Sequence, residues 1–294
     1  MHPDHPAYAR PHPLIGKAFA HKFQFFSFLF LFDNYFIKTT MEDTMNLTEF
    51  WQMNPKVAIA FSGGVDSAYL LCSAVRSGAD VKAYYAKTAF QPAFELRDAQ
   101  RLARELGAEL KVLELDILED ETLVSNPANR CYFCKKRIFS AIQQAALEDG
   151  FRLILDGTNA SDSEADRPGM KALQELSVRS PLREAGLTKQ EIREASRRAG
   201  LFTWNKPSYA CLATRIPTGA VITQAQLCRT EWAEDYLHTL GFRDLRVRQQ
   251  GNLARVQLPA DQMGRFLSLR EEILPTLKAR YDGVVLDMEE RNGQ

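Results

Sequence analysis

Short apolar runs alternate with amphipathic stretches from residue 57 onward. In each amphipathic stretch apolar residues recur every three or four positions, and a glycine often comes last, which is the pattern of a helix and its end. We predict strands at 57–61, 81–86, 109–117, 151–159 and 178–182, and helices at 68–78, 92–107, 135–150 and 187–200. Strands that alternate with helices predict an α/β fold with a doubly wound parallel sheet.

The alternation stops at residues 203–219, an irregular stretch that we interpret as a functional loop joining two domains. Beyond it the pattern predicts a helix at 223–241, a hairpin in 245–258 that turns at 251–252, a helix at 259–281 interrupted at Pro275, and a strand at 283–288. We therefore place the doubly wound domain at 46–205 and a second, smaller α/β domain at 206–294.

Residues 1–45 fit neither domain. They are rich in Pro and His and contain an apolar run at 23–32, which is too short to cross a bilayer as a helix. No small-residue cleavage pattern follows the run. We predict a non-domain N-terminal extension, with Met41 or Met45 as the true start, and no membrane partner.

Composition places the chain among folded globular proteins, with 45% hydrophobic and 25% charged residues among 294. Lys plus Arg and Asp plus Glu both number 37, so no overall positive charge points to a nucleic-acid partner. The five cysteines are an odd number and indicate thiols or metal ligands in a reducing compartment rather than a disulfide framework. We predict a cytoplasmic protein.

The string SGGVDS at 62–67 lies between a predicted strand and a predicted helix. Its glycines let backbone N–H groups approach a phosphate, and the helix N-terminus adds unpaired donors and the positive end of a dipole. Asp66 would repel a phosphate, so its expected role is to position Mg²⁺ or to cap the helix. An ordinary glycine turn before a helix is the alternative, but the complete string makes it less probable.

This string lacks the lysine and spacing of a Walker A motif and resembles the PP-loop of the ATP pyrophosphatase superfamily. The resemblance implies an adenine nucleotide α-hydrolase-like fold and cleavage of ATP between its α and β phosphates. AMP would pass to a substrate oxygen, with ATP and Mg²⁺ as cofactors.

Later strings narrow the resemblance. In order they are NRCYFCKK at 129–136, DGTN at 156–159, DRPG at 166–169, VRSPL at 178–182, KPSYACLATR at 206–215 and the arginine-rich hairpin at 246–255. From about Trp51 to the end, the chain is similar to the LarE-type sacrificial sulfur transferases, which make the nickel-pincer cofactor of lactate racemase. The resemblance implies that a carboxylate of pyridinium-3,5-dicarboxylate mononucleotide is adenylated and converted to a thiocarboxylate, by an enzyme that forms homo-oligomers.

Site residues follow from the matching positions. The resemblance implies that Cys211 and Asp66 are catalytic. It implies ATP binding by Ser62, Gly63, Gly64, Asp66, Ser67, Gly157 and Thr158, and substrate or phosphate binding by Arg179, Arg215, Arg246 and Arg248. For each arginine taken singly, a solvated charged strand face is the alternative.

Cys211 occupies the position of the cysteine that family members sacrifice as sulfur donor. Because this chemistry needs a thiolate, we expect Lys206 and Arg215 to lower the pKa of Cys211. Cys131 and Cys134 form a CxxC, and with Cys211 they make three soft ligands that suit a 4Fe–4S cluster with one open iron. We favour the cluster as sulfur donor, with a structural zinc or a CxxC without metal as alternatives.

Two other functions remain open at this point. A tRNA thiolation enzyme also combines a PP-loop with cysteines, but it predicts a basic RNA-binding surface. A non-catalytic nucleotide- or metal-binding protein would use the same loop and cysteines without turnover.

Overall fold

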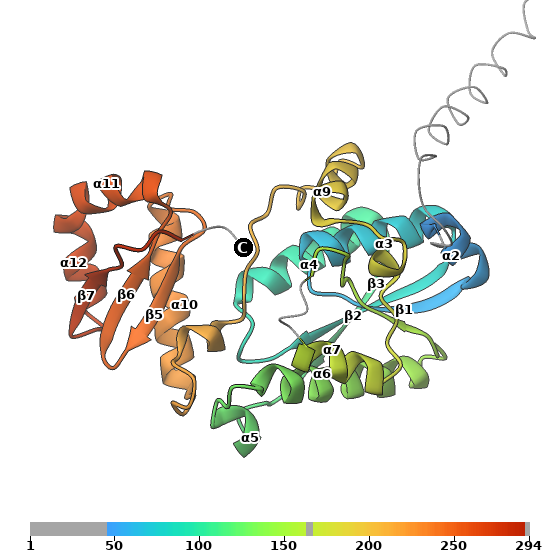
Figure 1. Cartoon of the computed structure of the whole chain (residues 1–294), viewed down its shortest axis with the longest axis horizontal. Coiled ribbons are helices and arrows are strands. Elements are labelled where there is room, and N and C mark those ends of the chain that lie inside the picture. The colour runs from blue at the N-terminus through green and yellow to red at the C-terminus, as the bar shows by residue number, and fades with distance from the viewer. Residues whose placement is uncertain (1–45, 163–166, 292–294) are drawn as a thin grey trace, which may run out of the picture. The chain divides into compact units, whose positions relative to one another are not determined.

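The computed structural model describes residues 46–162 and 167–291 (Figure 1). The predicted N-terminal extension, residues 1–45, lies outside the described residues. The first part contains α2 (Leu47–Met53), β1 (Lys56–Ala60), α3 (Val65–Ser77), β2 (Asp80–Lys87), α4 (Ala93–Leu106), β3 (Glu109–Glu114), α5 (Glu121–Val124), α6 (Arg130–Glu148), β4 (Ile154–Leu155), α7 (Arg167–Glu175), α8 (Pro181–Glu184) and α9 (Lys189–Arg198).

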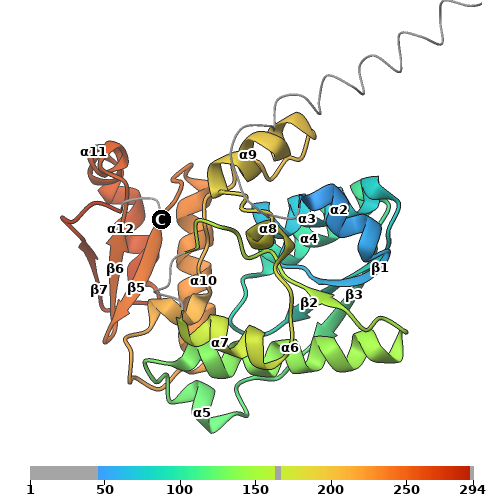
Figure 2. The ribbon, with the colours of Figure 1, turned by 45° about the vertical axis from the view of Figure 1, so that its right-hand side comes forward.

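The four strands of this part form one parallel sheet in the order β3-β2-β1-β4. Alternate residues of β1 point to opposite faces: Val57 and Ile59 pack in a core with α3, and Ala58 packs in a second core with α6. Figures 1 and 2 show α6 and α7 on one side of the sheet and α3 and α4 on the other. Helices on both faces confirm the predicted doubly wound α/β fold.

A second sheet of three strands forms toward the C-terminus. This part contains a 3₁₀ turn (Leu212–Arg215), α10 (Gln224–Thr239), β5 (Arg246–Gln250), β6 (Leu253–Gln257), α11 (Ala260–Ser268), α12 (Arg270–Lys278) and β7 (Gly283–Leu286). Strands β5 and β6 form the predicted antiparallel hairpin, and β7 pairs parallel to β6. The sheet packs on α10, α11 and α12 around a core of its own, which includes Leu237, Val247 and Leu277. The smaller α/β part is therefore present, and the boundary at 205–206 stays a prediction.

Several helix ends follow the sequence signals. Gly78 and Gly107 adopt the left-handed conformation directly after α3 and α4, with φ of 80° and 67°. Thr188 caps α9 and forms a capping box with Glu191. Because the termini of these helices are fixed by local hydrogen bonds, the sequence alone locates them.

Three predicted elements differ in the structure. The strand expected at 151–159 is shortened to the two residues of β4, Ile154–Leu155. The expected strand at 178–182 is reduced to one bridge between Leu155 and Arg179, because Pro181 opens the short helix α8 instead. The helix at 259–281 is broken at Leu269, and Pro275 lies inside α12. The buried Ile273 and Leu277 hold α12 on the core on both sides of the proline.

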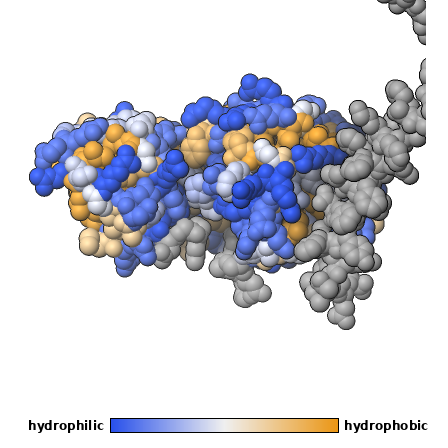
Figure 3. Space-filling model, turned by 90° about the horizontal axis from the view of Figure 1, so that it is seen from above, coloured by the Kyte–Doolittle hydropathy of each residue, from blue (hydrophilic) through white to orange (hydrophobic). Residues whose placement is uncertain are grey.

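Among the described residues, no helix is both long and apolar enough to cross a membrane. On the face of the molecule in Figure 3, hydrophilic side chains break up the hydrophobic patches.

Candidate active site

The SGGVDS string forms the turn between β1 and α3, as predicted. Gly63 has φ of 71°, and a Cβ on it would lie 3.1 Å from the Ala99 backbone nitrogen, so the loop packs directly against α4. Ser62 Oγ and Ser67 Oγ lie 3.1 Å apart. The loop therefore presents two hydroxyls beside the N-terminus of α3, whose N-cap Gly64 makes no side-chain cap hydrogen bond. A helix N-terminus of this kind attracts anions.

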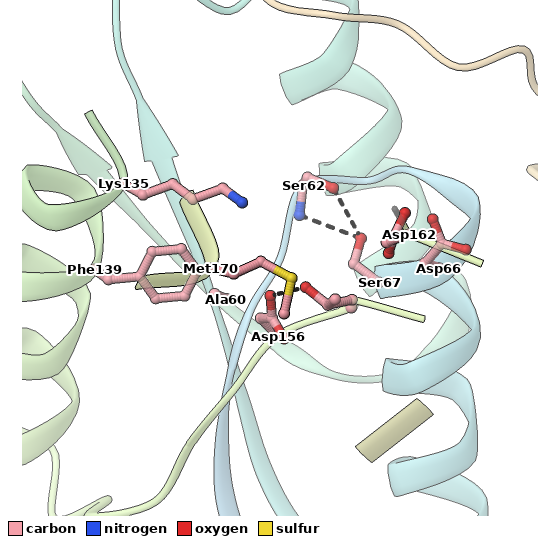
Figure 4. A pocket seen from close by; sticks show the side chains of 11 residues that line it. Ala60, Ser62, Asp66, Ser67, Lys135, Phe139, Asp156, Asp162 and Met170 are labelled. Atoms are coloured by element: carbon pink, nitrogen blue, oxygen red, sulfur yellow. Dashed lines mark hydrogen bonds between the residues drawn. The ribbon is translucent and has the colours of Figure 1, made fainter. Parts of the chain in front are cut away.

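A cavity of about 450 Å³ opens beside this loop (Figure 4). Its lining comes from the end of β1, the start of α3, the loop after β4, and one face of α6 and α7. The lining residues are Ala60, Ser62, Asp66, Ser67, Lys135, Phe139, Asp156, Gly157, Thr158, Asp162 and Met170. Five of the seven residues expected to bind ATP thus line one cavity, and Gly63 and Gly64 belong to the same loop.

The loop after β4 closes tightly on the PP-loop. A Cβ on Gly157 would lie 2.8 Å from the backbone nitrogen of Ser67, which is closer than side chains approach. Asp156 accepts hydrogen bonds from Ser180 Oγ at 2.6 Å and from Thr158 Oγ1 at 2.5 Å. Gly157 is therefore required by packing, and Asp156 fixes the loop that carries Thr158.

Asp66 contacts two polar side chains from outside the PP-loop. Its carboxylate pairs with Lys189 at the first turn of α9 and accepts a hydrogen bond of 3.3 Å from Asn159 Nδ2. Burial raises the pKa of Asp66, and the charge of Asp162 raises it further, whereas Lys189 lowers it. Lys189 therefore offsets part of the effect that burial has on the pKa of this carboxyl group.

The three cysteines of interest lie close enough to influence one another. Cys131 and Cys134 occupy the first turns of α6, and Cys134 and Cys211 pack against the same apolar cluster. Burial raises the pKa of Cys134 to about 12, and the charges of Cys211 and Cys131 also raise it. Arg130 Nη2 lies 3.7 Å from Cys211 Sγ. Two segments 80 residues apart thus bring three thiols and one guanidinium together.

The electrostatics of Cys211 differ from the expectation. Its pKa is raised, because burial outweighs the lowering effects of Arg130 and, more weakly, Arg215. Lys206 was expected to lower this pKa, but its Nζ donates to Asp98 Oδ2 at 2.7 Å and to the Gly63 carbonyl at 3.4 Å. The free thiol is therefore the favoured form of Cys211 in this structure.

Arg215 is buried and anchors the loop that contains Cys211. Its Nε and Nη2 donate to the Glu234 carboxylate at 2.8 and 3.1 Å, and its Nη1 donates to Thr214 Oγ1 and to the Ala210 carbonyl. Arg215 is only 1% exposed. Each of its guanidinium nitrogens already has a protein partner, and the phosphate-binding role expected from the sequence stays a prediction.

The hairpin arginines lie close to Arg215 and to one another. Burial lowers the pKa of Arg246 to about 10, and the positive charges of Arg215 and Arg291 lower it further. Arg248 experiences the same effects, and it donates to the Thr214 carbonyl at 2.7 Å and to Gln257 Oε1 at 2.5 Å. An anion near this group would relieve the repulsion between its positive charges.

Arg179 lies elsewhere. Its guanidinium pairs with Glu184 at 2.5 Å and stacks on Phe50 of α2, with 4.7 Å between the guanidinium carbon and the ring centre. Its backbone lies beside β4 of the first sheet, whereas Arg215, Arg246 and Arg248 belong to the C-terminal part, so the structure does not bring Arg179 together with the other three predicted phosphate ligands.

Comparison with known proteins agrees with this geometry. The family model of the queuosine biosynthesis protein QueC matches residues 56–129, which include the PP-loop. The pyridinium-3,5-bisthiocarboxylic acid mononucleotide synthase of Lactiplantibacillus plantarum is 35% identical over 238 residues, covering 79% of this chain and 86% of the synthase. The chain belongs to the LarE family. An uncharacterized protein of Synechocystis is 37% identical and covers 83% of this LarE chain and 92% of its own length.

The tRNA thiolases are more distant from this LarE chain. The tRNA-specific 2-thiouridylase MnmA of Fervidobacterium nodosum is 27% identical, over 52% of this chain and 55% of the thiouridylase. The thiouridylase of Thermotoga neapolitana is 26% identical over 74% of both proteins, so the thiouridylases differ from the L. plantarum synthase mainly by their lower identity to this chain.

Three groups in this LarE chain were not singled out from the sequence: Lys189, Glu234 and Arg130. Lys189 contacts Asp66 across 123 positions and Arg215 contacts Glu234 across 19, so no local pattern connects either pair. Arg130 directly precedes the CxxC, and that adjacency was the one available signal. Each of the three contacts a residue that the sequence did identify, namely Asp66, Arg215 and Cys211 in turn.

Cys131, Cys134 and Cys211 are the metal ligands expected from the sequence. Among the described residues, no three His, Cys, Asp or Glu side chains converge closely enough to hold a metal ion as they stand. Cys131 is exposed, whereas Cys134 and Cys211 are partly buried. The three sulfur donors gather in one region, and a cluster would bind to them only after side chains rearrange.

Proposed function

We propose that this chain is an ATP-dependent sulfurtransferase that converts a carboxylate of pyridinium-3,5-dicarboxylate mononucleotide into a thiocarboxylate during nickel-pincer cofactor synthesis. The observation that carries the proposal is that helix α6 contributes side chains both to the cavity at the PP-loop and to the group of three cysteines. Its first two turns carry Cys131 and Cys134, and Lys135 and Phe139 of the same helix line the cavity at the PP-loop. The similarity to the L. plantarum synthase, over 79% of this chain and 86% of the synthase, supports the choice of substrate.

In the first step the PP-loop N–H groups and the hydroxyls of Ser62 and Ser67 bind the phosphates of ATP. A substrate carboxylate oxygen attacks the α-phosphorus, and pyrophosphate leaves. Asp66 and Asp162 present oxygen ligands of the kind Mg²⁺ prefers, so they would hold the ion that neutralises the departing charge. Lys189 then releases part of its contact with Asp66 to the metal or the phosphates.

In the second step sulfur attacks the acyl carbon and AMP leaves. Arg246 and Arg248 are proposed to hold the substrate phosphate, because both lie near the positive charges of Arg215 and Arg291. Both also contact the loop around Cys211, where Arg246 donates to the Ser208 carbonyl and Arg248 to the Thr214 carbonyl, each at 2.7 Å. An arginine fork matches a phosphate in geometry. The substrate would then extend from the hairpin toward the PP-loop cavity.

For the sulfur source we propose a 4Fe–4S cluster held by Cys131, Cys134 and Cys211. The donor set supports this assignment, because three thiolates are soft ligands and leave one iron open. These cysteines would hold the cluster, and its open iron would offer a place for an additional sulfide, which is sulfur at the oxidation level that thiocarboxylate formation needs. Arg130 would compensate part of the negative charge that the thiolates bring into this region.

The decisive experiment for the activity is exchange of labelled pyrophosphate into ATP. We expect exchange that requires the pyridinium dicarboxylate mononucleotide and is lost in the Asp66→Asn variant. A nucleotide-binding protein without turnover would bind ATP and show no exchange, and exchange driven by tRNA instead would favour the thiolase alternative.

The sulfur source is tested separately by iron and acid-labile sulfide assay after anaerobic purification. We expect iron and sulfide in the wild type and their loss in each of the variants Cys131→Ala, Cys134→Ala and Cys211→Ala. Cys228→Ala is the matched control, because Cys228 is an exposed thiol on α10. No iron together with dehydroalanine at position 211 after turnover would replace the cluster by the sacrificial route.

A further inference from the structure

Lys206 connects the nucleotide loop to the segment that leads to Cys211. Its side chain is 17% exposed and its Nζ donates to the carbonyl of Gly63 at 3.4 Å and to Asp98 Oδ2 of α4 at 2.7 Å. Gly63 packs on the same helix, since a Cβ there would touch Ala99. The ammonium group therefore links the PP-loop and α4 to the chain five residues before the reactive cysteine.

Helix α9 also contacts both the PP-loop and the segment that leads to Cys211. Lys189 pairs with Asp66 of the PP-loop, and Arg193, one turn later, donates to the carbonyls of Trp204 at 2.7 Å and Lys206 at 2.8 Å. Residues four apart lie on one face of a helix, so α9 contacts both segments with a single rigid face. The PP-loop, α9 and the backbone at 204–206 form a closed ring of contacts.

Aromatic side chains extend these contacts from Lys206 to the loop that contains Cys211. Lys206 Nζ lies 5.3 Å from the ring centre of Phe94, and the Tyr209 ring packs edge-on against Phe94 with 5.0 Å between centres. Leu212 N donates to the Phe90 carbonyl at 2.8 Å. The loop on both sides of Cys211 thus rests on residues at the start of α4 and just before it.

We propose that Lys206 is a positioning residue that couples nucleotide binding at the PP-loop to the placement of the Cys211 loop. The inference rests on the nucleotide site of the proposed function. Bound phosphates bring negative charge next to Gly63, and they attract the ammonium group that now contacts the Gly63 carbonyl. Movement of Lys206 toward them draws the 206–211 segment along α4, so the sulfur site is set only when nucleotide is present.

Hydrogen exchange of the full chain with and without a non-hydrolysable ATP analogue and Mg²⁺ tests this inference. In the wild type we expect the analogue to slow exchange in the PP-loop and, by about threefold or more, in residues 206–215. In Lys206→Met, which retains the apolar stem, the PP-loop response should persist while the response of 206–215 disappears. Lys111→Met is the matched control, since Lys111 pairs with Asp149 at 3.1 Å on β3.

Catalysis gives a second measurement that a purely structural role would not produce. Lys206→Met should keep substrate-dependent pyrophosphate exchange within about threefold of wild type, and thiocarboxylate formation should fall about tenfold or more. Asp98→Asn should weaken the coupling in the same direction. If the analogue slows hydrogen exchange in the PP-loop of the wild type but not in residues 206–215, the inference is wrong and the proposed function still stands. Failure to protect either segment would overturn both.

Discussion

Arg215 offers the sharpest test of how the Cys211 loop is held. The structure makes it half of a buried ion pair with Glu234, with exposed side-chain fractions of 1% and 2%. In Arg215→Met, Glu234 keeps hydrogen bonds from Tyr209 Oη at 2.5 Å and Val247 N at 2.8 Å but loses its counterion. Removing one partner of a buried pair costs about 3–5 kcal/mol, so we expect a loss of unfolding free energy of that size.

The assay is urea unfolding of wild type, Arg215→Met, Glu234→Gln and the double variant. In the double variant no buried charge is left alone, so its destabilisation should be smaller than the sum of the single ones by about 1–3 kcal/mol. This coupling separates the ion pair from general packing loss. Far-UV circular dichroism before unfolding checks that each variant is folded.

The opposite outcome is equally specific. If Arg215→Met unfolds like the wild type and instead raises the KM for the mononucleotide, then Arg215 binds substrate and the anchoring argument is wrong. If the single losses simply add, the two side chains do not act as a pair.

Three further outcomes follow from individual groups. Burial raises the pKa of Glu95 from 4.5 to about 7, so the free energy of unfolding should fall as the pH rises from 4.5 to 7. Urea unfolding at pH 5 and 8 should show this fall, of roughly 3 kcal/mol at most, in the wild type and not in Glu95→Gln. Hydrogen bonds, chiefly from Tyr84, lower the pKa of Asp149 from 3.8 to about 2. Its contribution is thus present above pH 3.8 and lost as the pH falls through 2, and the melting temperatures of wild type and Asp149→Asn should differ at pH 7 and converge below pH 2. Gly157→Ala should weaken ATP binding about tenfold or more in calorimetry, because its Cβ would meet Ser67 N, whereas Gly264→Ala, with open space around it, should bind like wild type.

The sequence predicted the layers of the fold well because those layers depend on periodicity. Val57, Ala58 and Ile59 alternate between two cores, and the glycines after α3 and α4 mark their ends. The predicted strand at 178–182 does not form, because a strand needs a neighbouring strand of similar length to pair with. Its neighbour β4 is only two residues long, so a single bridge forms before Pro181 starts a helical turn.

Site residues were predictable where a local string fixes the geometry. The PP-loop is such a case, since its six residues form the predicted turn between β1 and α3. The electrostatics of Cys211 were not predictable, because they depend on burial and on Arg130 from a distant helix. Lys206 and Arg215 flank Cys211 in sequence, yet their charged groups pair with Asp98 and Glu234.

Helix α6 has a consequence for how this sequence can change in length. Cys131 and Cys134 begin the helix, and Lys135 and Phe139 reach the nucleotide cavity from its next turns. A residue inserted between 131 and 139 would rotate everything after it by about 100° and advance it by about 1.5 Å. No loop lies between the two sets to absorb that rotation. Insertions and deletions should therefore be tolerated after Glu148, where the helix ends, and be incompatible with activity in its first three turns.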